Sequence, residues 1–307
     1  MSASTEAPLW LVTGASGFLG ANLGFFLNER GERIAVTRSG TTPPGFDSAV
    51  AADLAHPDAL AQHVMLRRPT VVIHAAAMAS HEQCEADPQR AHRINVDATE
   101  SIAAAAATVG ATFVLISTDA VFDGAQGQYR EDDLPNPTSV YGKTKLLAEQ
   151  RAMAVSDAMI IRTNFFGWSP SGRRSILEFF VNELSAGHRV RGFTDFTTSS
   201  AYAQVLAETI VELTERSATG VFHVTSPDAL TKYEFGLAAA QTFGLDSNLI
   251  TPTTADIHPP RSGNISLDVS KVQVELGHQL PTQVEGLQRA AHDATMLRPA
   301  LRGPASP

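Results

Sequence analysis

Residues 9–20 have the sequence LWLVTGASGFLG, in which a short apolar run leads directly into a turn with three glycines. The run Leu9–Thr13 is typical of a buried strand, and the residues after Gly17 are typical of a helix. Gly14 allows a tight turn, Gly17 lets the backbone approach a phosphate, and Gly20 permits close packing of the helix on the strand. The first amides of the helix then face the phosphate. The stretch predicts a dinucleotide-binding turn whose contacts are Gly14, Ser16, Gly17, Phe18, Leu19 and Gly20.

The alternation of strand and helix patterns continues to about residue 165. The expected strands are rich in β-branched residues and comprise Leu9–Thr13, Arg33–Thr37, Val71–His74, Thr112–Ser117 and Met159–Arg162. The expected helices are Phe18–Glu29, Ala59–Leu66, Pro88–Val109 and Val140–Ala154. This order predicts an α/β fold with a doubly wound parallel sheet, a Rossmann domain that covers residues 1–165.

Beyond residue 165 the helical patterns are separated by longer stretches that contain Gly, Ser and Pro. We expect residues 166–297 to form a smaller, loop-rich lobe, from which some segments return to the sheet. Open α/β sheets bind ligands at the carboxyl ends of their strands, so the lobe is expected to lie there and to bind substrate. The Pro-rich residues 298–307 are expected to form a disordered tail.

Charge and composition exclude several classes of protein. The formal net charge of −9 disfavours nucleic acid as a partner, because phosphate binding needs clustered Lys and Arg. No apolar run is long enough to span a bilayer and the chain starts without a signal peptide, so we expect a cytoplasmic protein without a membrane partner. The one cysteine, Cys84, is expected to be a small packed residue. No metal site is expected, since residues 81–85 (HEQCE) lack a recognised ligand spacing.

A second motif lies at the start of the last helix expected in the Rossmann domain. Tyr141 and Lys145 are four residues apart, so both side chains project from one face of that helix. A nearby ammonium favours the phenolate, and we therefore expect Lys145 to lower the pKa of Tyr141 so that it can exchange a proton with an alcohol or carbonyl oxygen. The pattern alone also fits an exposed Tyr and Lys pair, and its weight comes from its neighbours.

One of these neighbours is the strand end at residues 115–124, LISTDAVFDG. A hydroxyl at the carboxyl end of a buried strand can donate a hydrogen bond to a substrate oxygen as negative charge develops there. Thr118 is the expected donor. Ser117 fits a structural capping role as well as a functional one, and both remain open.

With these motifs in this order, the chain resembles the extended short-chain dehydrogenase/reductase superfamily and, within it, the dTDP-4-dehydrorhamnose reductase-like branch. The phrases that carry the resemblance are IHAAAMASHEQCEADPQRAHRINVDAT, LISTDAVFDG, YREDDLPNPTSVYGKTKLLAEQ and PPRSGNISLDVSKVQVELG, so it covers nearly the whole chain. It implies that Tyr141 is the acid/base, Lys145 its electrostatic partner and ribose clamp, and Thr118 the donor to the substrate oxygen. It also implies that Asn95 supports a proton-relay water, that Asp53 and Leu54 flank the adenine, and that Ala75, Ala76 and Ala77 lie along the cofactor.

The chain departs from its resemblance in places that concern the substrate. Related sugar 4,6-dehydratases have an Asp-Glu pair after the threonine, whereas here Asp119 is followed by Ala120, which disfavours a dehydratase. The reductases usually have a tyrosine at the position of Ala120, and residues 196–200 (FTTSS) also differ from their pattern. Asp119, Asn164, Arg173 and Arg261 are the expected substrate contacts.

Arginines gather in the first part of the second lobe. Between residues 160 and 195 there are Arg162, Arg173, Arg174, Arg189 and Arg191 against Glu178, Glu183 and Asp195, a surplus of two positive charges. Arginine forks suit phosphates, so this lobe could hold the diphosphate of a nucleotide-linked sugar. Solvated arginines on amphipathic helices explain any single one of them equally well.

Residues 38 and 39 predict the choice of cofactor. In NAD-binding versions of this fold an acidic residue about 20 positions after the glycine turn accepts hydrogen bonds from the ribose 2′-hydroxyl. Here the position holds Arg38, followed by Ser39, and no acidic residue occurs before Asp47. Arg38 can pair with a 2′-phosphate, to which Ser39 can also donate, so the expected cofactor is NADPH.

The expected activity is NADPH-dependent reduction of a keto group, most simply C4 of a nucleotide-activated deoxysugar, with Tyr141 as proton donor. Two alternatives stay open: a reductase or epimerase of a small natural-product ketone, and a non-catalytic cofactor-binding subunit similar to the one that accompanies methionine adenosyltransferase. The expected partner is a small-molecule substrate. The assembly is left open, with a homodimer as the candidate.

Overall fold

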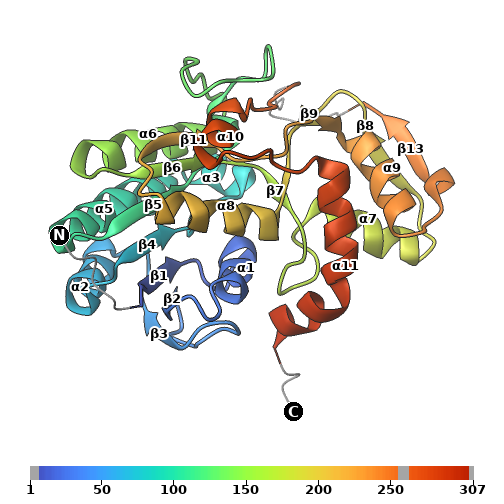
Figure 1. Cartoon of the computed structure of the whole chain (residues 1–307). Helices are drawn as coiled ribbons and strands as arrows, with labels where there is room; N and C mark the ends of the chain where they lie inside the picture. Colours follow the sequence, from blue (N-terminus) through green and yellow to red (C-terminus); the bar gives the residue numbers. More distant parts are fainter. Residues whose placement is uncertain (1–6, 255–262, 304–307) are drawn as a thin grey trace.

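The computed structural model describes residues 7–254 and 263–303. Its centre is a seven-stranded sheet with the order β11-β6-β5-β4-β1-β2-β3, in which all neighbours are parallel (Figure 1). The strands are β1 (Leu9–Thr13), β2 (Glu32–Thr37), β3 (Ser48–Ala51), β4 (Val71–His74), β5 (Thr112–Ile116), β6 (Met159–Arg162) and β11 (Gly220–His223). The expected doubly wound α/β fold is confirmed, and β11 is the segment of the second half that returns to the sheet.

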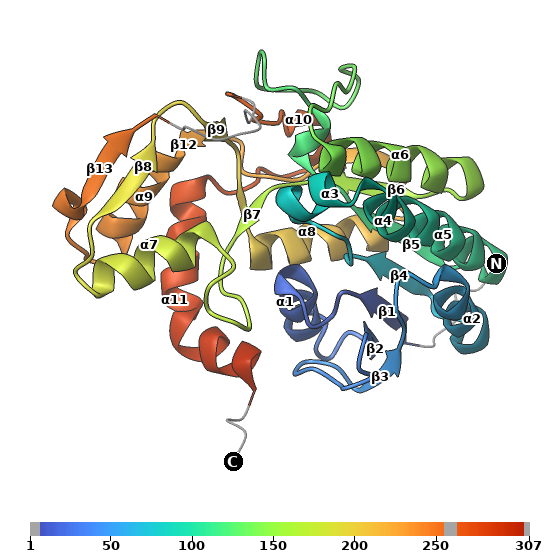
Figure 2. The same ribbon diagram turned by 180° about the vertical axis from the view of Figure 1, so that it is seen from behind.

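Helices cover both faces of this sheet. On one face lie α1 (Phe18–Phe26), α8 (Ala203–Glu215) and α10 (Ser270–Leu276), which share an apolar core with β1, β5 and β6. On the other lie α2 (Pro57–Arg67), α5 (Ala98–Val109) and α6 (Val140–Val155), seen from their own side in Figure 2. The short helices α3 (His81–Ala86) and α4 (Pro88–His92) precede α5, and a π-helical turn, Arg93–Asp97, joins α4 to α5. Residues 88–109 are thus helical as expected, with a local change of hydrogen bonding.

The second lobe has a core of its own. Its helices are α7 (Ile176–Ser185), α9 (Lys232–Thr242) and α11 (Gln283–Arg302). Its strands form three pairs: β7 (Phe165–Phe166) with β10 (Ala201–Tyr202), β9 (Thr197–Thr198) with β12 (Leu230–Thr231), and β8 (Val190–Phe193) with β13 (Ile250–Thr253). Aromatic side chains fill the centre, with Phe166, Trp168, Phe180 and Phe235 all buried.

The prediction of a disordered tail from residue 298 is wrong for residues 298–302, which form the end of α11. The helix continues through Pro299, although this ring removes one amide donor, because the residues on either side remain packed. Leu301 is buried in the core of the second lobe, and the guanidinium of Arg298 lies 4.6 Å from the ring centre of Trp168. None of the helices in the described part of the chain has the length and apolar character that a membrane span needs.

A buried amide connects the two halves of the chain. Asn22, on α1, is fully buried, and its side-chain nitrogen donates to the carbonyl oxygen of Trp168 at 2.9 Å. Its side-chain oxygen accepts a hydrogen bond from Gln204, on α8, at 2.7 Å. The first helix of the Rossmann domain therefore holds the start of the loop that leads into α7.

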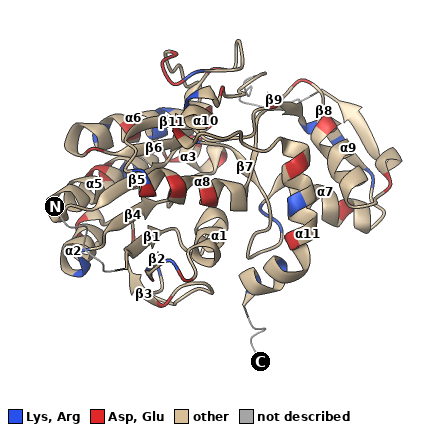
Figure 3. Ribbon diagram, in the orientation of Figure 1, with Lys and Arg blue, Asp and Glu red and all other residues tan. Residues whose placement is uncertain are grey.

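Ion pairs and side-chain caps close the outside of the sheet. Acidic residues form a row along α8 (Figure 3), and Glu208 and Glu212 of this helix pair with Arg289 and Arg216, respectively.

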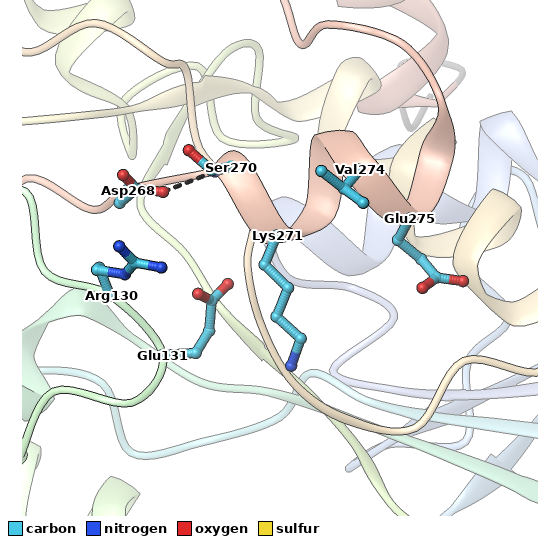
Figure 4. A pocket seen from close by; sticks show the side chains of 7 residues that line it. All are labelled: Arg130, Glu131, Asp268, Ser270, Lys271, Val274 and Glu275. Atoms are coloured by element: carbon cyan, nitrogen blue, oxygen red, sulfur yellow. Dashed lines mark hydrogen bonds between the residues drawn. The ribbon is translucent and has the colours of Figure 1, made fainter.

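At the outer edge of β11, Lys271 donates to the carbonyl of Val221 at 2.6 Å, and the amide of His223 donates to Glu131 at 2.9 Å. Lys271 and Glu131 border a small hollow of about 310 Å³ (Figure 4). Their hydrogen bonds to the backbone of β11 occupy groups that could otherwise pair with another strand.

A buried ion pair ties α6 to the sheet. Arg162, on β6, donates to both carboxylate oxygens of Glu149, on α6, at 2.8–3.2 Å. The exposed fractions of the two side chains are 5% and 0%. Ser117, at the end of β5, donates to the same carboxylate. The side chain of Ser117 therefore has a structural role, one of the two that the sequence left open for it, and Ser117 also lines the cleft described below.

We expect Arg162→Ala to lower the free energy of unfolding by about 3–5 kcal/mol, because the Glu149 carboxylate then stays buried without its counter-charge. Arg30→Ala is the matched control: Arg30 pairs with Glu215 at 3.3 Å with exposed fractions of 46% and 59%. That change should cost less than about 1 kcal/mol. Urea unfolding followed by circular dichroism measures both, and equal losses in the two variants would contradict the assignment.

Candidate active site

A large cleft runs along the carboxyl ends of the parallel strands and continues between the sheet and the second lobe. Its volume is about 2070 Å³. Residues that follow β1, β2, β4, β5 and β6 line one side, and residues of α7, β8 and α9 line the other. This is the place where open α/β sheets bind their ligands.

The glycine turn has the geometry expected of a phosphate site. Gly14 has φ +69°, and its carbonyl accepts the amide of Gly17 at 2.8 Å. A Cβ on Gly20 would lie 2.2 Å from that carbonyl, so a side chain there would force the turn open. Helix α1 starts after Gly17 without a side-chain cap and without an acidic residue in its first turn. Its first amides are thus suited to an anion, and all six predicted residues of the turn line the cleft.

The residues predicted to surround the adenine half of the cofactor also lie together in the cleft. Arg38 is exposed directly after β2, and it lines the cleft together with Asp53, Leu54 and the strand-end alanines 75–77. The backbone of Ala76 approaches Gly14 so closely that a Cβ on Gly14 would lie 2.9 Å from its nitrogen. Ser39 differs from the expectation: its hydroxyl bonds the hydroxyl of Thr41 at 3.0 Å, and it is not among the described residues that line the cleft.

Tyr141 and Lys145 face the cleft from the first turns of α6. Ser139 caps this helix by accepting the amide of Gly142. A Cβ on Gly142 would lie 2.2 Å from the carbonyl of Ala120, so glycine here lets α6 approach the strand end at residues 117–121. This contact brings Tyr141 beside Thr118, as the sequence predicted.

The electrostatics of this pair differ from the expectation. Burial raises the pKa of Tyr141 above its ordinary value, and the charge of Asp119 raises it further, whereas a hydrogen bond from Thr118 lowers it. Lys145 is buried and donates to the carbonyl of Ile116 at 2.7 Å. Burial lowers the pKa of Lys145 to about 8, partly offset by Glu149. In this state Thr118, rather than Lys145, is the group that lowers the pKa of the tyrosine.

Asp119 is the centre of a buried polar network. Its carboxylate accepts hydrogen bonds from Thr118 at 3.1 Å, Asn164 at 2.8 Å and Thr198 at 3.2 Å. Ser200 in turn donates to the side-chain oxygen of Asn164 at 2.9 Å. Burial raises the pKa of Asp119 to about 6 against the effect of these donors. Asp119 and Asn164 were predicted from the sequence as substrate contacts. Thr198 and Ser200 were not, although they line the cleft within the divergent segment 196–200.

Asn95 lies behind the site. It is buried in the π-helical turn, where its side chain bonds both backbone groups of Met78 at 2.8 and 3.1 Å and the hydroxyl of Thr144 at 3.0 Å. It is not among the described residues that line the cleft, so its side chain holds the segment after β4 against α6. Its predicted part in a proton relay stays a prediction.

His81 is a site residue that sequence reasoning considered only as a metal ligand. It begins α3, lines the cleft, and its ring centre lies 5.0 Å from that of Tyr141. The Oε1 of Glu85, on the same helix, accepts the amide of Val140 at 2.8 Å, which fixes α3 to the start of α6. The signal available in the sequence was its place just after the strand-end alanines. Among the described residues no cluster of His, Cys, Asp or Glu is arranged to hold a metal ion.

The second lobe contributes cations and aromatic rings to the cleft. Of the arginines singled out in the sequence, Arg173, Arg174 and Arg191 line it. Arg162 is instead held in the buried ion pair, and Arg189 lies outside the lining. Lys232 lies 4.9 Å from the ring centre of Phe196 and 5.6 Å from that of Phe193. Arg261, an expected substrate contact, lies outside the described residues.

A parallel Rossmann sheet with an open glycine turn, together with Thr118, Tyr141 and Lys145 at one cleft, defines the extended short-chain dehydrogenase/reductase class. Within this class, the model of the family described as RmlD substrate binding domain matches residues 10–296, and the chain belongs to this family. The resemblance seen in the sequence is thereby confirmed.

Individual relatives agree with this assignment. The chain is 33% identical to the "Probable low-salt glycan biosynthesis reductase Agl14" of Haloferax volcanii over 90% of its length and 95% of the relative's. It is 31% identical to "Methionine adenosyltransferase 2 subunit beta" of Xenopus tropicalis, over 89% of its own length and 84% of the relative's. The crystal structure of a hypothetical dTDP-4-dehydrorhamnose reductase from Sulfolobus tokodaii is 32% identical, with a TM-score of 0.80 over 90% of this chain and 98% of that one.

Proposed function

We propose that the protein is an NADPH-dependent reductase of a keto group, most simply C4 of a nucleotide-activated deoxysugar. The observation that carries this proposal is the joint position of Thr118, Tyr141 and Lys145 in one cleft with the glycine turn. Membership of the RmlD substrate binding domain family supports it, as does the similarity to a chain described as a hypothetical dTDP-4-dehydrorhamnose reductase.

The residues present fit a bound dinucleotide. The turn at Gly14–Gly20 leaves room and uncapped amides for a diphosphate, and the small side chains at 75–77 leave room along the strand end. Arg38 supplies a cation where the ribose of the adenine half would lie. The cofactor supplies the hydride, while the protein positions the keto oxygen and delivers a proton to it.

Tyr141 donates that proton as the keto oxygen becomes an alkoxide. Thr118 stabilises the oxygen that carries the developing charge, and Lys145 would hold a ribose hydroxyl of the bound cofactor. Asp119, Asn164, Thr198 and Ser200 form a polar floor that can bind the hydroxyl groups of a sugar ring. Arg191 and Lys232, with Phe193 and Phe196, form a wall that suits a nucleoside diphosphate.

A second function is favoured by the similarity to the methionine adenosyltransferase subunit, namely regulation by a cofactor-binding protein without turnover. The small-ketone alternative also shares the Tyr141 chemistry but needs no diphosphate site. The three functions differ in measurable ways: turnover separates the first from the second, and nucleotide-sugar binding separates the first from the third.

We expect Tyr141→Phe to lower the rate of NADPH oxidation with a dTDP-linked 4-keto-6-deoxysugar by about a hundredfold or more, because the ring remains and the proton donor is lost. Absorbance of NADPH follows the reaction. Tyr202→Phe is the control and should keep full activity, because the hydroxyl of Tyr202 bonds Asp293 at 3.0 Å and Tyr202 is not among the described residues that line the cleft. A Tyr141→Phe variant as fast as the parent would show that Tyr141 is not the donor.

Arg38 should decide between the two nicotinamide cofactors. A charge-assisted contact with the 2′-phosphate contributes about 1.5–3 kcal/mol, which corresponds to a preference of about ten- to a hundredfold. NADPH should therefore bind at least about tenfold tighter than NADH, and Arg38→Ala should remove most of this difference. Fluorescence titration measures the Kd values, with Arg67→Ala at the exposed end of α2 as control. Equal affinities in the parent protein would contradict the role of Arg38.

Arg191 should hold the diphosphate of the substrate. Arg191→Ala is expected to raise the Kd of a dTDP- or UDP-sugar about tenfold or more and to leave the Kd of NADPH unchanged. Arg189→Ala, two residues away and outside the cleft lining, is the matched control. Titration calorimetry measures both. If no nucleotide-sugar binds the parent protein, the small-ketone alternative takes precedence.

A further inference from the structure

The hydroxyl of Thr118 has more partners than it has protons. Its oxygen accepts the amide of Ala120 at 3.1 Å. The same hydroxyl donates to Oδ1 of Asp119 at 3.1 Å and is also placed to donate to Tyr141. A hydroxyl carries one proton, so at any moment Thr118 can donate either to Asp119 or toward the reacting centre at Tyr141.

The other oxygen of Asp119 is already occupied. Its Oδ2 accepts hydrogen bonds from both Asn164 and Thr198, at 2.8 and 3.2 Å. A proton that binds to Asp119 therefore resides on Oδ1, opposite Thr118. In that state Asp119 donates to the oxygen of Thr118, which still accepts the amide of Ala120, and the Thr118 proton is free to turn toward Tyr141 or, with substrate bound, toward the keto oxygen beside it.

We propose that Asp119 is a positioning residue that sets the direction of the Thr118 proton, so that the site works only while Asp119 is protonated. This inference rests on the proposed reductase function. Asp119 then does more than contact the substrate, because the protonation state of its buried carboxyl group decides where the hydroxyl of Thr118 donates.

Charge acts in the same direction as the hydrogen bonds. An ionised Asp119 takes the Thr118 proton and, through its negative charge, raises the pKa of Tyr141, which makes the tyrosine a weaker acid. Asn164 and Thr198 face Asp119 without charge. The titratable groups on α6 are Tyr141 and Lys145, and the latter is held by the carbonyl of Ile116 and by the field of Glu149.

The sign of the pH dependence follows. Burial raises the pKa of Asp119 to about 6, so the protonated, working form dominates below this value and declines above it. The rate of hydride transfer should fall about tenfold for each pH unit above the pKa of Asp119. The affinity for NADPH should not follow this titration, since the hydrogen bonds of Asp119 go to Thr118, Asn164 and Thr198 and not to the glycine turn.

Asp119→Asn provides a matched test. The side-chain amide of Asn164 donates to Oδ2 at 2.8 Å, so it holds the amide oxygen of the new side chain in that place, where the hydroxyl of Thr198 can also donate. Its NH2 group then replaces Oδ1 and donates to Thr118 at every pH. We expect single-turnover hydride transfer in this variant to stay level from about pH 5 to about pH 7.5, where the parent declines. Asp132→Asn is the control, because Asp132 is 84% exposed in a loop, and it should keep the parent profile.

Two outcomes would overturn the proposal. If Asp119→Asn declines with pH as the parent does, another group controls the rate. If it transfers no hydride at any pH while it still binds NADPH, Asp119 serves as a proton source or a substrate ligand and does not act through Thr118.

A measurement without substrate separates this inference from the proposed function. Infrared difference spectra between about pH 5 and about pH 8 should show the loss of a carboxylic acid band that Asp119→Asn lacks and Asp132→Asn keeps. Absence of that band contradicts the inference for Asp119. A parent protein that shows the band but reduces no keto sugar contradicts the proposed function instead.

Discussion

The buried pair of Glu149 and Arg162 is the interaction on which the candidate site depends most. It joins α6 to β6, the strand next to the β11 edge of the sheet, and Ser117 completes it from the end of the neighbouring strand β5. Lys145 is one helical turn before Glu149, and Thr118 follows Ser117 directly. Tyr141, Lys145 and Thr118 therefore lie on segments that this buried charged contact helps to hold together. Such a contact contributes little net stability compared with an apolar core, but it tolerates few alternative geometries.

The part of the fold that could be predicted is the part in which local pattern and tertiary structure agree. The strands at 9–13, 71–74 and 159–162 are buried on both faces, so their apolar runs identify them. The strand β3 was missed because Ser48–Ala51 has two small alanines and only one β-branched residue. The strand pairs of the second lobe are two residues long in β7, β9, β10 and β12, too short for any periodicity.

The same limit explains which site residues were found. Glycines at a turn, and Tyr141 with Lys145 on one helical face, are local patterns that sequence displays. Thr198 and Ser200 enter the cleft through contacts between distant segments, which no spacing reveals. The pKa of Tyr141 shows the same limit: the lysine four residues away predicted a lowered pKa, whereas burial and the charge of Asp119 raise it.

The hydrogen bond from Asn22 to the carbonyl of Trp168 can couple the binding of two ligands. Asn22 lies in the helix that starts at the glycine turn, and Trp168 begins the loop that bears Arg173 and Arg174. A ligand that restrains this helix also restrains the arginine loop, so the entropy of ordering the loop is lost once and not twice. The affinities for the two ligands are then coupled, and by reciprocity each must strengthen the other by the same factor.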